Sequence, residues 1–532
     1  MRRHHIIVVL LAVLVALVLA LWPWMTGDQE APESPPQSSG ELDDYPRGSS
    51  IPWQSWGDAA LVRAGSEGKG LFVYFHGQWC TWCRQYQSET LEDQDTVAAI
   101  KQGFVPVLVN LDQRRDLFTR LGGRGLPFTV IMDAEGEPLG RFTGHVGAQD
   151  LQGLLRETAA RIATAEAVPA GLETLMDGDP QRFLAFLEET YDPASHRLSR
   201  ASVLGTLSKR PQPMTYRLLL HEPGWSGRMA DMLDVLREDL HDPVDGGFFF
   251  FYDPDQPNPD TAVETSKVLG LNAMLVWLFA DAYAELGREV DARVVRETLD
   301  YLVGRLWDDT QLSFWGSQYS DPDYYSKPPA ERAGLPPPPV ERVQYADVSG
   351  QMIVALVHAA EALDEPRYLQ WAAQALGGLD EHVAHPDGGY YHFRRDGGEA
   401  QLAGYLPAQV WPAAAWWSYY EATGDAQAAR RGAQLLERIA VHEDVDLNGF
   451  VERLDGDLTP WAESRTHGAL GWLLTGPARV AQVPEEVLSP SRRAPWMGMA
   501  ASHLQMVGGG DPDDMALGVK ALRLITTQGS GK

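Results

Sequence analysis

The hydrophobic and polar positions divide the chain into regions of distinct character. Near the N-terminus, an uninterrupted apolar run is followed by a stretch rich in proline, serine, glycine and acidic residues that shows no apolar periodicity. Short apolar runs then alternate with amphipathic stretches, which is typical of strands alternating with helices, before helix-period patterns take over. The predicted regions are a transmembrane segment (residues 1–25), a flexible linker (26–50), an α/β domain (51–163) and a helical domain (169–532).

The α/β region has the pattern of one compact domain. Its predicted order is strand, helix, strand and helix, then a two-stranded hairpin and a closing helix, within about 110 residues. The tight sequence Ala-Glu-Gly at residues 134–136 joins the last two strands. The expected strands are 71–75, 104–110, 127–133 and 138–144, and the expected closing helix is 149–162.

The helical region repeats a unit of two helices and an aromatic, glycine-containing segment. The aromatic segments begin at Asp245, Leu312, Asp387 and Leu447. Their spacing of roughly 60 to 75 residues predicts helical hairpins stacked in a ring or arc. A proline-rich insertion at residues 321–343 is expected to form an exposed loop beside one end of the ring. The expected helix pairs are 267–286 with 290–306, 347–363 with 367–383, and 408–423 with 426–441.

The apolar run at the N-terminus predicts a membrane anchor. Residues 6–22, extended through residue 25, give about 20 residues, which is enough to cross a hydrocarbon layer of about 30 Å. Arg2 and Arg3 precede the run and are expected to stay in the cytoplasm. A signal peptide removed after Ala20 is the alternative. We therefore expect a single-pass protein of the inner (cytoplasmic) membrane with its bulk in the periplasm or another extracytoplasmic space.

Composition and charge restrict the partners. With 44% hydrophobic and 22% charged residues, the chain has the composition of a globular protein. Its formal net charge is −29, because 73 acidic residues face only 44 lysines and arginines. Binding to nucleic acid depends on basic patches that neutralise phosphates, so we expect no nucleic-acid partner.

Both cysteines of the chain lie in the stretch FHGQWCTWCR, residues 75–84. Such a close pair is a poor structural crosslink for an exported protein, because the stabilisation from a disulfide grows with the length of the loop that it closes. Cys80 follows a predicted strand and opens a helix, where unpaired N–H groups and the helix dipole favour a thiolate. Cys83, one turn later, can attack a mixed disulfide at Cys80 and release the partner as a thiol.

Neighbouring side chains complete this predicted catalytic site. Trp79 and Trp82 are expected to shield the sulfurs and to offer an apolar contact to a substrate chain. Pro127 begins a strand, where a cis proline would bring the Leu126 backbone beside the cysteines. The redox-active disulfide is the only expected cofactor, and no metal is expected. Since the chain has no third cysteine, the expected partners are protein thiols or disulfides and a separate redox protein.

The strand, the W-C-x-x-C helix start and the G-x-P segment before a hairpin resemble the thioredoxin superfamily. The likeness extends to the periplasmic domains of transmembrane thiol:disulfide interchange proteins. Residues 80–110, CTWCRQYQSETLEDQDTVAAIKQGFVPVLVN, also resemble the spermatogenesis-associated thioredoxin-like family, whose bacterial members carried a domain-of-unknown-function label. In that family the thioredoxin-like domain precedes an α/α barrel, so the resemblance implies an all-α, six-hairpin-glycosidase-like toroid of (α/α)6 type for residues 169–532.

This chain departs from the family pattern near the cysteines. Thr81 and Arg84 stand where the family commonly has histidine. Leu126 replaces a tryptophan that usually precedes the proline, and Tyr74 occupies the position of a buried acid that handles protons in many thioredoxins. The redox potential and the proton route are therefore open. Two other interpretations also stand, a redox fold kept only as a scaffold and a metal-binding pair assisted by His76.

The helical region supports a second hypothesis, in which the barrel acts on carbohydrate. Glycoside chemistry needs two carboxyl groups beside a sugar-binding cleft. The resemblance aligns residues 264–267 with an H-F-E-K stretch, of which only the lysine is kept. The aromatic segments could stack on sugar rings, or they could simply fill the core of the ring. The candidate barrel-mouth site consists of Asp245, Glu264, Lys267 and Asp347.

The sequence thus predicts a membrane-anchored, periplasm-facing thiol–disulfide oxidoreductase that uses the Cys-Thr-Trp-Cys pair. The helical toroid would bind a client or a redox partner. The alternative is a carbohydrate-binding or carbohydrate-processing α/α barrel with an accessory thioredoxin-like domain. A structural adaptor whose cysteines are incidental is the third hypothesis.

Overall fold

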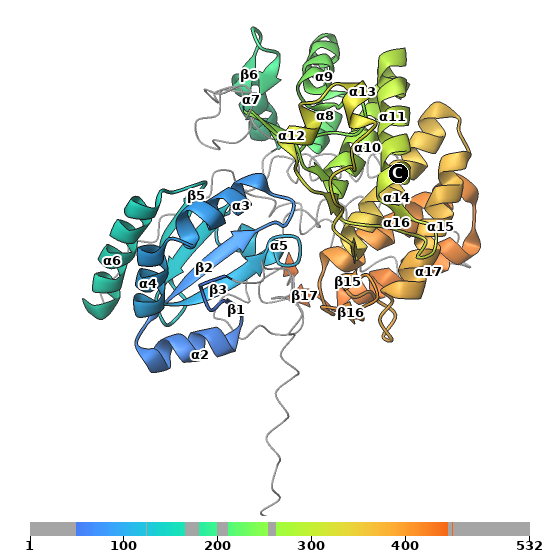
Figure 1. Cartoon of the computed structure of the whole chain (residues 1–532). Helices are drawn as coiled ribbons and strands as arrows, with labels where there is room; N and C mark the ends of the chain where they lie inside the picture. Colours follow the sequence, from blue (N-terminus) through green and yellow to red (C-terminus); the bar gives the residue numbers. More distant parts are fainter. Residues whose placement is uncertain are drawn as a thin grey trace, which may run out of the picture. The chain divides into compact units, whose positions relative to one another are not determined.

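The structure is a computed structural model of the whole chain (Figure 1). It describes residues 49–123, 125–164, 180–198, 211–253, 262–444 and 449–450. All of these residues belong to one compact unit. The predicted transmembrane segment at 1–25 and nearly all of the predicted linker at 26–50 lie outside the described residues, as does most of the aromatic segment that begins at Leu447.

The first described domain is built on a five-stranded sheet with the order β1-β3-β2-β4-β5 (Figure 1). β1, β3 and β2 run parallel, and β4 pairs antiparallel with both β2 and β5. β2 and β3 are buried along their whole length, because each is a nearly continuous apolar run. The strands are β1 (Gln54–Ser55), β2 (Gly70–His76), β3 (Phe104–Asn110), β4 (Phe128–Met132) and β5 (Pro138–Thr143).

Helices cover this sheet and continue the predicted order. α2 packs against β2 and β3, and α4 packs against β3 and α6. The four long strands and the closing helix agree with the predicted ranges to within one or two residues, whereas the short β1 and α2 were not predicted. The helices are α2 (Asp58–Glu67), α3 (Thr81–Tyr86), the π-helical turn η2 (Gln87–Leu91), α4 (Gln94–Gly103), α5 (Arg115–Arg120) and α6 (Ala148–Thr164).

The second domain consists of helical hairpins joined by short strands. α14 packs against α10 on one side and α16 on the other, and α8 packs against α10 (Figure 1). α11, α15 and α17 each follow one of these inner helices as its antiparallel partner. The helices are α7 (Pro180–Thr190), α8 (Pro213–Leu219), α9 (Ser226–Leu240), α10 (Leu269–Leu286), α11 (Glu289–Arg305), α14 (Ala346–Leu363), α15 (Arg367–His382), α16 (Pro407–Thr423) and α17 (Ala426–Ala440).

The inner and outer helices differ in sequence for a physical reason. α10, α14 and α16 are apolar on nearly all sides and are mostly buried, whereas α11, α15 and α17 bury one face and expose charged residues on the other. Leu269–Leu286 is long and apolar enough to cross a membrane, but 67% of it is buried inside the domain, so it is a core helix. The three predicted helix pairs are therefore confirmed as the two layers of an α/α toroid.

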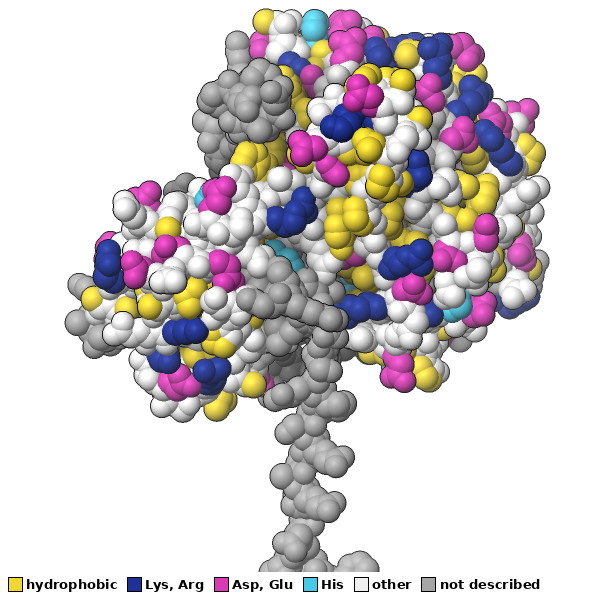
Figure 2. All heavy atoms as spheres, in the orientation of Figure 1, with side chains coloured by type: hydrophobic (Ala, Val, Ile, Leu, Met, Phe, Trp, Pro, Cys, Tyr) yellow, Lys and Arg dark blue, Asp and Glu magenta, His cyan; other side chains and the backbone are white. Residues whose placement is uncertain are grey.

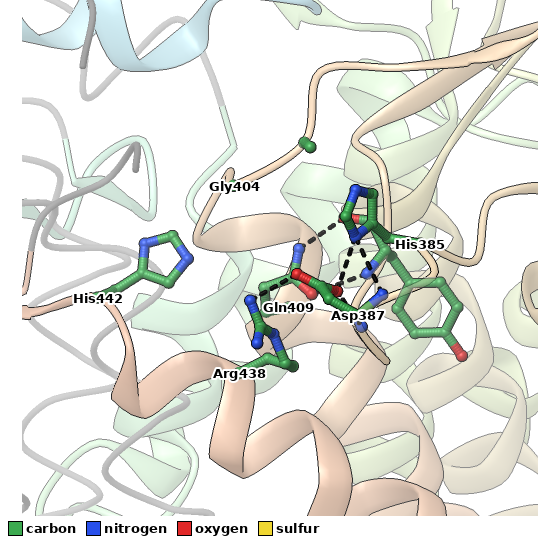
Figure 3. A pocket seen from close by; sticks show the side chains of 9 residues that line it. His385, Asp387, Gly404, Gln409, Arg438 and His442 are labelled. Carbon is green, nitrogen blue, oxygen red and sulfur yellow. Dashed lines mark hydrogen bonds and ion pairs between the residues drawn. The ribbon is translucent and has the colours of Figure 1, made fainter. Parts of the chain in front are cut away.

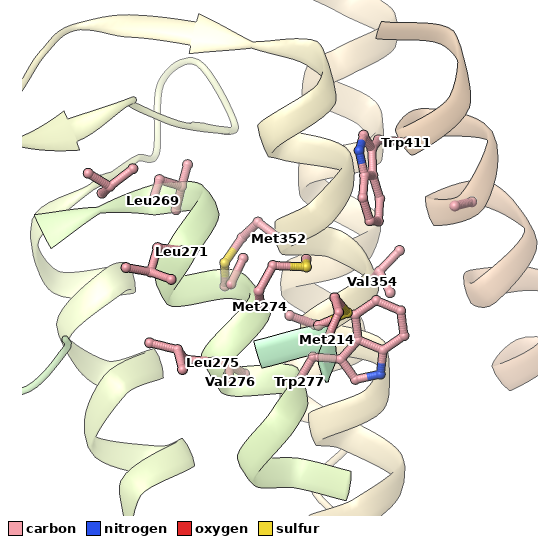
Figure 4. Packing of buried hydrophobic residues seen from close by; sticks show 14 of the residues in the cluster. Met214, Leu269, Leu271, Met274, Leu275, Val276, Trp277, Met352, Val354 and Trp411 are labelled. Atoms are coloured by element: carbon pink, nitrogen blue, oxygen red, sulfur yellow. The ribbon is translucent and has the colours of Figure 1, made fainter. Parts of the chain in front are cut away.

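Close packing between inner helices forms the core of the toroid (Figure 4). Met274 and Trp277 of α10 lie beside Met352 of α14, and Trp411 of α16 lies beyond them (Figure 4). A Cβ atom added to Gly350 would lie 2.5 Å from the backbone carbon of Trp411, so α14 and α16 approach closely only because residue 350 is glycine.

Short antiparallel strand pairs join the helices. Buried aromatic residues such as Phe248, Phe314 and Tyr390 come from these connections, which makes them part of the core. Gly246 and Gly247 both have positive φ, so the Asp-Gly-Gly sequence supplies turn geometry. The pairs are β6 (Tyr191–Asp192) with β7 (Arg197–Leu198), β8 (Phe251–Tyr252) with β9 (Val263–Glu264), β10 (Lys267–Val268) with β13 (Ser317–Gln318), β11 (Trp307–Asp308) with β12 (Ser313–Phe314), β14 (Val343–Tyr345) with β15 (Phe393–Arg395), β15 with β16 (Ala400–Gln401), and β17 (Glu443–Asp444) with β18 (Gly449–Phe450).

The insertion at residues 321–343 differs in part from the expected exposed loop. Much of it is exposed, but it contains the short helices α12 (Pro322–Tyr325) and α13 (Pro329–Arg332). The side chains of Tyr324, Tyr325 and Arg332 are buried in the toroid. On the face drawn in Figure 2, acidic and basic side chains are interspersed over both domains.

Candidate redox site at the junction of the two domains

The two cysteines lie where β2 gives way to α3. Cys80 is the N-cap residue of α3, and its Sγ accepts a hydrogen bond from the backbone N of Cys83 at 3.2 Å. Tyr74, which stands at the position of the proton-handling acid, donates its hydroxyl to the carbonyl oxygen of Cys83 at 3.2 Å. The local geometry therefore places one sulfur at a helix N-terminus and the other one turn later.

Pro127 precedes the strand next to β2 in the sheet. The Leu126–Pro127 peptide bond is cis, and the proline leads directly into β4. Phe128 of β4 pairs with Phe75 of β2, just before the cysteine loop. The cis proline therefore precedes the strand that pairs with β2, the strand that leads to the cysteines.

The burial of the sulfurs was not predicted. Cys80 is 2% exposed and Cys83 is 3% exposed. Burial raises the pKa of the Cys80 thiol well above its ordinary value, and the neighbouring Cys83 and the charge of Glu264 raise it further. The expectation of a thiolate held at the helix tip is wrong for this arrangement, because the loss of hydration outweighs the contribution of the helix N-terminus.

Trp79 faces the helical domain. Its Nε1 donates to Asp112 Oδ2 at 2.7 Å, and its ring meets the ring of Phe250 edge-on with centroids 4.6 Å apart. Trp82 is half-buried and packs against the apolar core. The apolar face of Trp79 that was expected to contact a substrate is therefore in contact with Phe250 of the toroid.

A segment after β13 covers the cysteine loop. The backbone N of Ser320 donates to the carbonyl oxygen of Trp79 at 3.2 Å, and Arg84 donates to the carbonyl oxygen of Ser320 at 3.0 Å. The hydroxyl of Tyr319 donates to the side-chain oxygen of Gln78. Tyr319 and Ser320 thus contact residues on both sides of Cys80 in the sequence.

Glu264 approaches Cys80 from the toroid. It is 3% exposed, and its Oε1 has no hydrogen-bond partner among the described residues. Burial raises the pKa of the Glu264 carboxyl, although hydrogen bonds from Ser320 and Ser266 and the charge of Arg84 act in the opposite direction. The carboxyl is therefore incompletely compensated beside a buried sulfur.

Asp347 lies at the same junction. Its Oδ1 is 3.4 Å from Nδ1 of His392, and Nε2 of that histidine lies 3.0 Å from the carbonyl oxygen of Asp112. Burial raises the pKa of Asp112, and the charge of Asp347 adds to this effect. Burial lowers the pKa of His392, which favours its neutral form. Asp347 is thus connected through His392 to Asp112 of the first domain.

Asp245 and Lys267 belong to a different cluster. Lys267 Nζ lies 2.8 Å from Asp242 Oδ2, with both side chains fully buried, and Arg332 bonds Asp242 at 3.0 Å and Asp245 at 3.4 Å. The ammonium also lies over the rings of Tyr301 and Tyr325. Of the four candidate barrel-mouth residues, Glu264 and Asp347 therefore lie at the junction, whereas Asp245 and Lys267 lie in this cluster. Lys267 takes part in a compensated network and not in an open cleft.

A separate cavity lies at the loop before β15 (Figure 3). Its volume is about 220 Å³, and Asp387 projects into it between His385 at 2.8 Å and Arg438 at 2.5 Å. Although burial raises the pKa of Asp387, hydrogen bonds from Gly389 and His385 and the charge of Arg438 lower it overall. The lining residues are His385, Asp387, Gly389, Tyr390, Ala403, Gly404, Gln409, Arg438 and His442.

Within the part of the chain that the structure describes, no three His, Cys, Asp or Glu residues are grouped so that they could hold a metal ion. A metal site at Cys80, Cys83 and His76 would therefore lack a complete set of protein ligands there.

Several residues of the junction could not be identified from the sequence. Asp112 lies two residues after the end of β3, and the ends of parallel strands are a weak positional signal for it. Ser320 and Phe250 lie about 240 and 170 residues from the cysteines and show no local pattern that could connect them to the site.

Comparison with known proteins agrees with this architecture. Residues 57–159 match the thioredoxin-like domain family. The thiol:disulfide interchange protein DsbD of Vibrio cholerae is 30% identical over 97 residues, covering 17% of this chain and 16% of that protein. Spermatogenesis-associated protein 20 of Rattus norvegicus is 27% identical over 67 residues, covering 13% of this chain and 8% of that protein. Each match thus covers under a fifth of the relative.

The helical domain has a structural relative as well. A crystal structure of D-mannose isomerase superposes with a TM-score of 0.51 at 11% identity, covering 68% of this chain and all of that one. At this identity the likeness establishes the fold alone. The chain therefore joins a domain of the thioredoxin-like family to a helical α/α toroid.

Proposed function

We propose that the protein is a thiol–disulfide oxidoreductase in which Cys80 attacks and Cys83 resolves. The observation that carries the proposal is the position of Cys80 Sγ at the N-terminus of α3, where it accepts a hydrogen bond from the N of Cys83 at 3.2 Å. This backbone N–H stabilises the sulfur when it becomes anionic. The thiolate can then take part in exchange once water can reach it.

The exchange balances with a client disulfide as the second reactant. The Cys80 thiolate attacks one client sulfur, a mixed disulfide forms, and the other client sulfur leaves as a thiolate. The thiolate of Cys83 then attacks Cys80 Sγ, the intramolecular disulfide forms, and the first client sulfur leaves. The client gains two electrons and the cysteine pair loses two, and a separate dithiol protein restores the reduced pair. The reverse sequence oxidises a client dithiol.

Trapping of the mixed disulfide tests this order. In Cys83→Ser, we expect covalent client complexes that run as new bands on non-reducing gels and disappear with reductant. In the matched variant Cys80→Ser, we expect none, because the attacking sulfur is gone. Identical behaviour of the two variants, together with a wild-type pair that shows no exchange, would overturn the proposal.

The membrane anchor and the extracytoplasmic location form part of the same proposal. The apolar run at residues 6–22, preceded by Arg2 and Arg3, supports them. Fractionation of cells that produce the full chain tests the anchor, which predicts recovery with the membranes after a high-salt wash. Protease added to spheroplasts should then digest the large domains.

The cavity around Asp387 favours a second candidate function, the binding of a small hydroxylated molecule. A carboxylate, a guanidinium and an amide line a space of about 220 Å³, and the fold is shared with a D-mannose isomerase. Saturation-transfer NMR with D-mannose tests it, with Asp387→Asn expected to lose the signal. Asp396→Asn, at an exposed ion pair with Arg342, serves as the control. No transfer with the wild-type protein would exclude mannose as a ligand.

A further inference from the structure

We propose that residues 319–320 of the toroid occupy the client-binding surface of the thioredoxin-like domain as an intramolecular stand-in for a client. The external client would be an extended polypeptide in which an aromatic residue directly precedes a disulfide-bonded cysteine. This inference rests on the proposed thiol–disulfide exchange and adds to it the recognition surface and the kind of partner.

Main-chain contacts define the surface first. Ser320 donates its N–H to the carbonyl oxygen of Trp79 at 3.2 Å and accepts from Arg84 through its own carbonyl oxygen at 3.0 Å. The groups that bind the segment therefore flank Cys80 on both sides in the sequence. Main-chain recognition of this kind accepts many sequences, as an enzyme with varied polypeptide clients requires.

Side chains supply the preference for an aromatic residue. The hydroxyl of Tyr319 donates to the side chain of Gln78, one residue before Trp79. Phe250, from the strand connection before β8, stacks edge-on against Trp79 at 4.6 Å. A client that displaced the segment would have to replace the contacts of Tyr319, whose ring is partly buried against the apolar core.

Ser320 stands at the position expected for the client cysteine. It is 6% exposed, and its backbone is tied to the peptide that directly precedes Cys80. Serine has the shape of cysteine but cannot form a disulfide, so the segment can occupy the surface without reacting. Its hydroxyl lies 2.7 Å from the hydroxyl of Thr265, which holds it within the toroid.

The contact also explains how the exchange can be restrained. With the segment in place, Cys80 is shielded from solvent and lies beside the charge of Glu264, and both effects favour the unreactive thiol. Displacement of the segment would admit water to Cys80, while the hydrogen bond from Cys83 N within α3 would remain. Client binding and activation of the sulfur would thus be one event.

Covalent trapping within the chain tests the position of Ser320. The experiment uses the full-length Cys83→Ser/Ser320→Cys variant with oxidised glutathione, which takes up two electrons and two protons as the disulfide between residues 80 and 320 forms. We expect this link in most molecules by intact-protein mass spectrometry and peptide mapping. The matched control is Cys83→Ser/Ser326→Cys, at an exposed position six residues later in the chain, where only glutathione adducts are expected.

A milder pair of variants covers the case in which residue 320 does not tolerate replacement. In the Cys83→Ser background, Tyr319→Phe removes only the hydroxyl bonded to Gln78, and Tyr283→Phe removes an exposed hydroxyl 3.4 Å from Glu289. We expect the reaction of Cys80 with 4,4′-dithiodipyridine to be about two- to tenfold faster in Tyr319→Phe and unchanged in Tyr283→Phe, since loss of one hydrogen bond favours opening to that extent.

The outcomes separate this inference from the proposed function. If residue 320 forms no link and Tyr319→Phe leaves the rate for Cys80 unchanged, while the wild-type pair still exchanges with a client, the stand-in is overturned and the oxidoreductase remains. If the wild-type pair exchanges with nothing, both are overturned. A link at residue 320 or a faster reaction of Cys80 in Tyr319→Phe supports the stand-in.

Discussion

Two buried carboxylates of the toroid, Asp242 and Glu264, have opposite surroundings. Asp242 has Lys267 at 2.8 Å and Arg332 at 3.0 Å, and although burial acts against it, these cations lower the pKa of its carboxyl. Glu264 has no cation at ion-pair distance among the described residues and one oxygen without a partner, and burial raises its pKa. The first carboxyl belongs to a compensated network, while the second is an incompletely compensated acid near Cys80.

The difference indicates that Asp242 stabilises the fold, whereas Glu264 belongs to the junction near Cys80. Burial lowers the pKa of Lys267 to about 8, and Asp242 opposes this shift, so the pair persists as ions at neutral pH. Such a network fixes the insertion through Arg332 onto the core. An uncompensated carboxylate costs stability, and a fold keeps one where another role requires it.

The largest effect is expected from Asp242→Asn. Removing this charge leaves Lys267 and Arg332 buried together without a counter-ion, and breaking such a pair costs about 3–5 kcal/mol. Chemical denaturation should show this loss of unfolding free energy at pH 7. The double variant Asp242→Leu/Lys267→Met should recover part of it, and a single variant as stable as the wild type would contradict the structural role of the network.

Asp291 is a third buried carboxyl, and its raised pKa predicts that the stability of the fold depends on pH. It is fully buried, and burial raises its pKa to about 6, although Arg288 at 3.4 Å acts in the opposite direction. The folded state therefore holds the proton more tightly than the unfolded state, so its contribution is present below about pH 4 and is lost as pH rises through about 6. Over this window the free energy of unfolding of the wild type should fall by up to about 3 kcal/mol, and Asp291→Asn should remove that fall.

That prediction is checked by measuring the free energy of unfolding at several pH values between about 4 and 7. The wild type should lose stability relative to Asp291→Asn as pH rises. Parallel profiles for the two proteins would show that Asp291 titrates as it does in the unfolded chain.

Glu264→Gln should have a smaller effect on stability, with the opposite sign to Asp242→Asn. Because its folded pKa is raised, the carboxyl stabilises the fold only below its unfolded pKa and loses this contribution as pH rises through the folded value. The neutral amide should leave the melting temperature at pH 8 unchanged or higher. A large drop would mean that Glu264 is compensated by contacts other than those seen.

The smallest effect is expected at the surface. Glu67 is bonded by Arg63 at 2.8 Å and Lys69 at 2.7 Å, and these hydrogen bonds lower its pKa to about 2. Solvent screens such pairs, so Arg63→Ala should leave the melting temperature within the error of the measurement. A clear shift would show that electrostatic changes at the surface matter as much as those in the two buried clusters.

Most secondary structure could be predicted because it rests on local patterns. Apolar runs fix β2 and β3, and helical periodicity fixes α14, α15, α16 and α17 to within a residue or two. The cysteine pair and Pro127 could be predicted as well, since their spacing and strand context lie within about 50 residues of sequence.

The junction could not be predicted, because it depends on contacts between distant segments. Ser320 reaches Trp79 across some 240 residues, and nothing in either stretch indicates the other. The thiolate expected at Cys80 was wrong for the same reason, since a helix N-terminus is visible in sequence but the burial supplied by another domain is not. Asp242, the partner of Lys267, lies before the Asp-Gly-Gly turn and was overlooked in favour of Asp245.

The redox equilibrium of Cys80 and Cys83 tests the central claim most directly. The full-length protein would be equilibrated in buffers of reduced and oxidised glutathione, quenched with acid, and analysed by mass spectrometry after alkylation. The account predicts a reversible two-electron transition between a dithiol and a Cys80–Cys83 disulfide, reached from both the reduced and the oxidised side. A pair that stays as two thiols in every buffer, or forms only separate glutathione adducts, would contradict it.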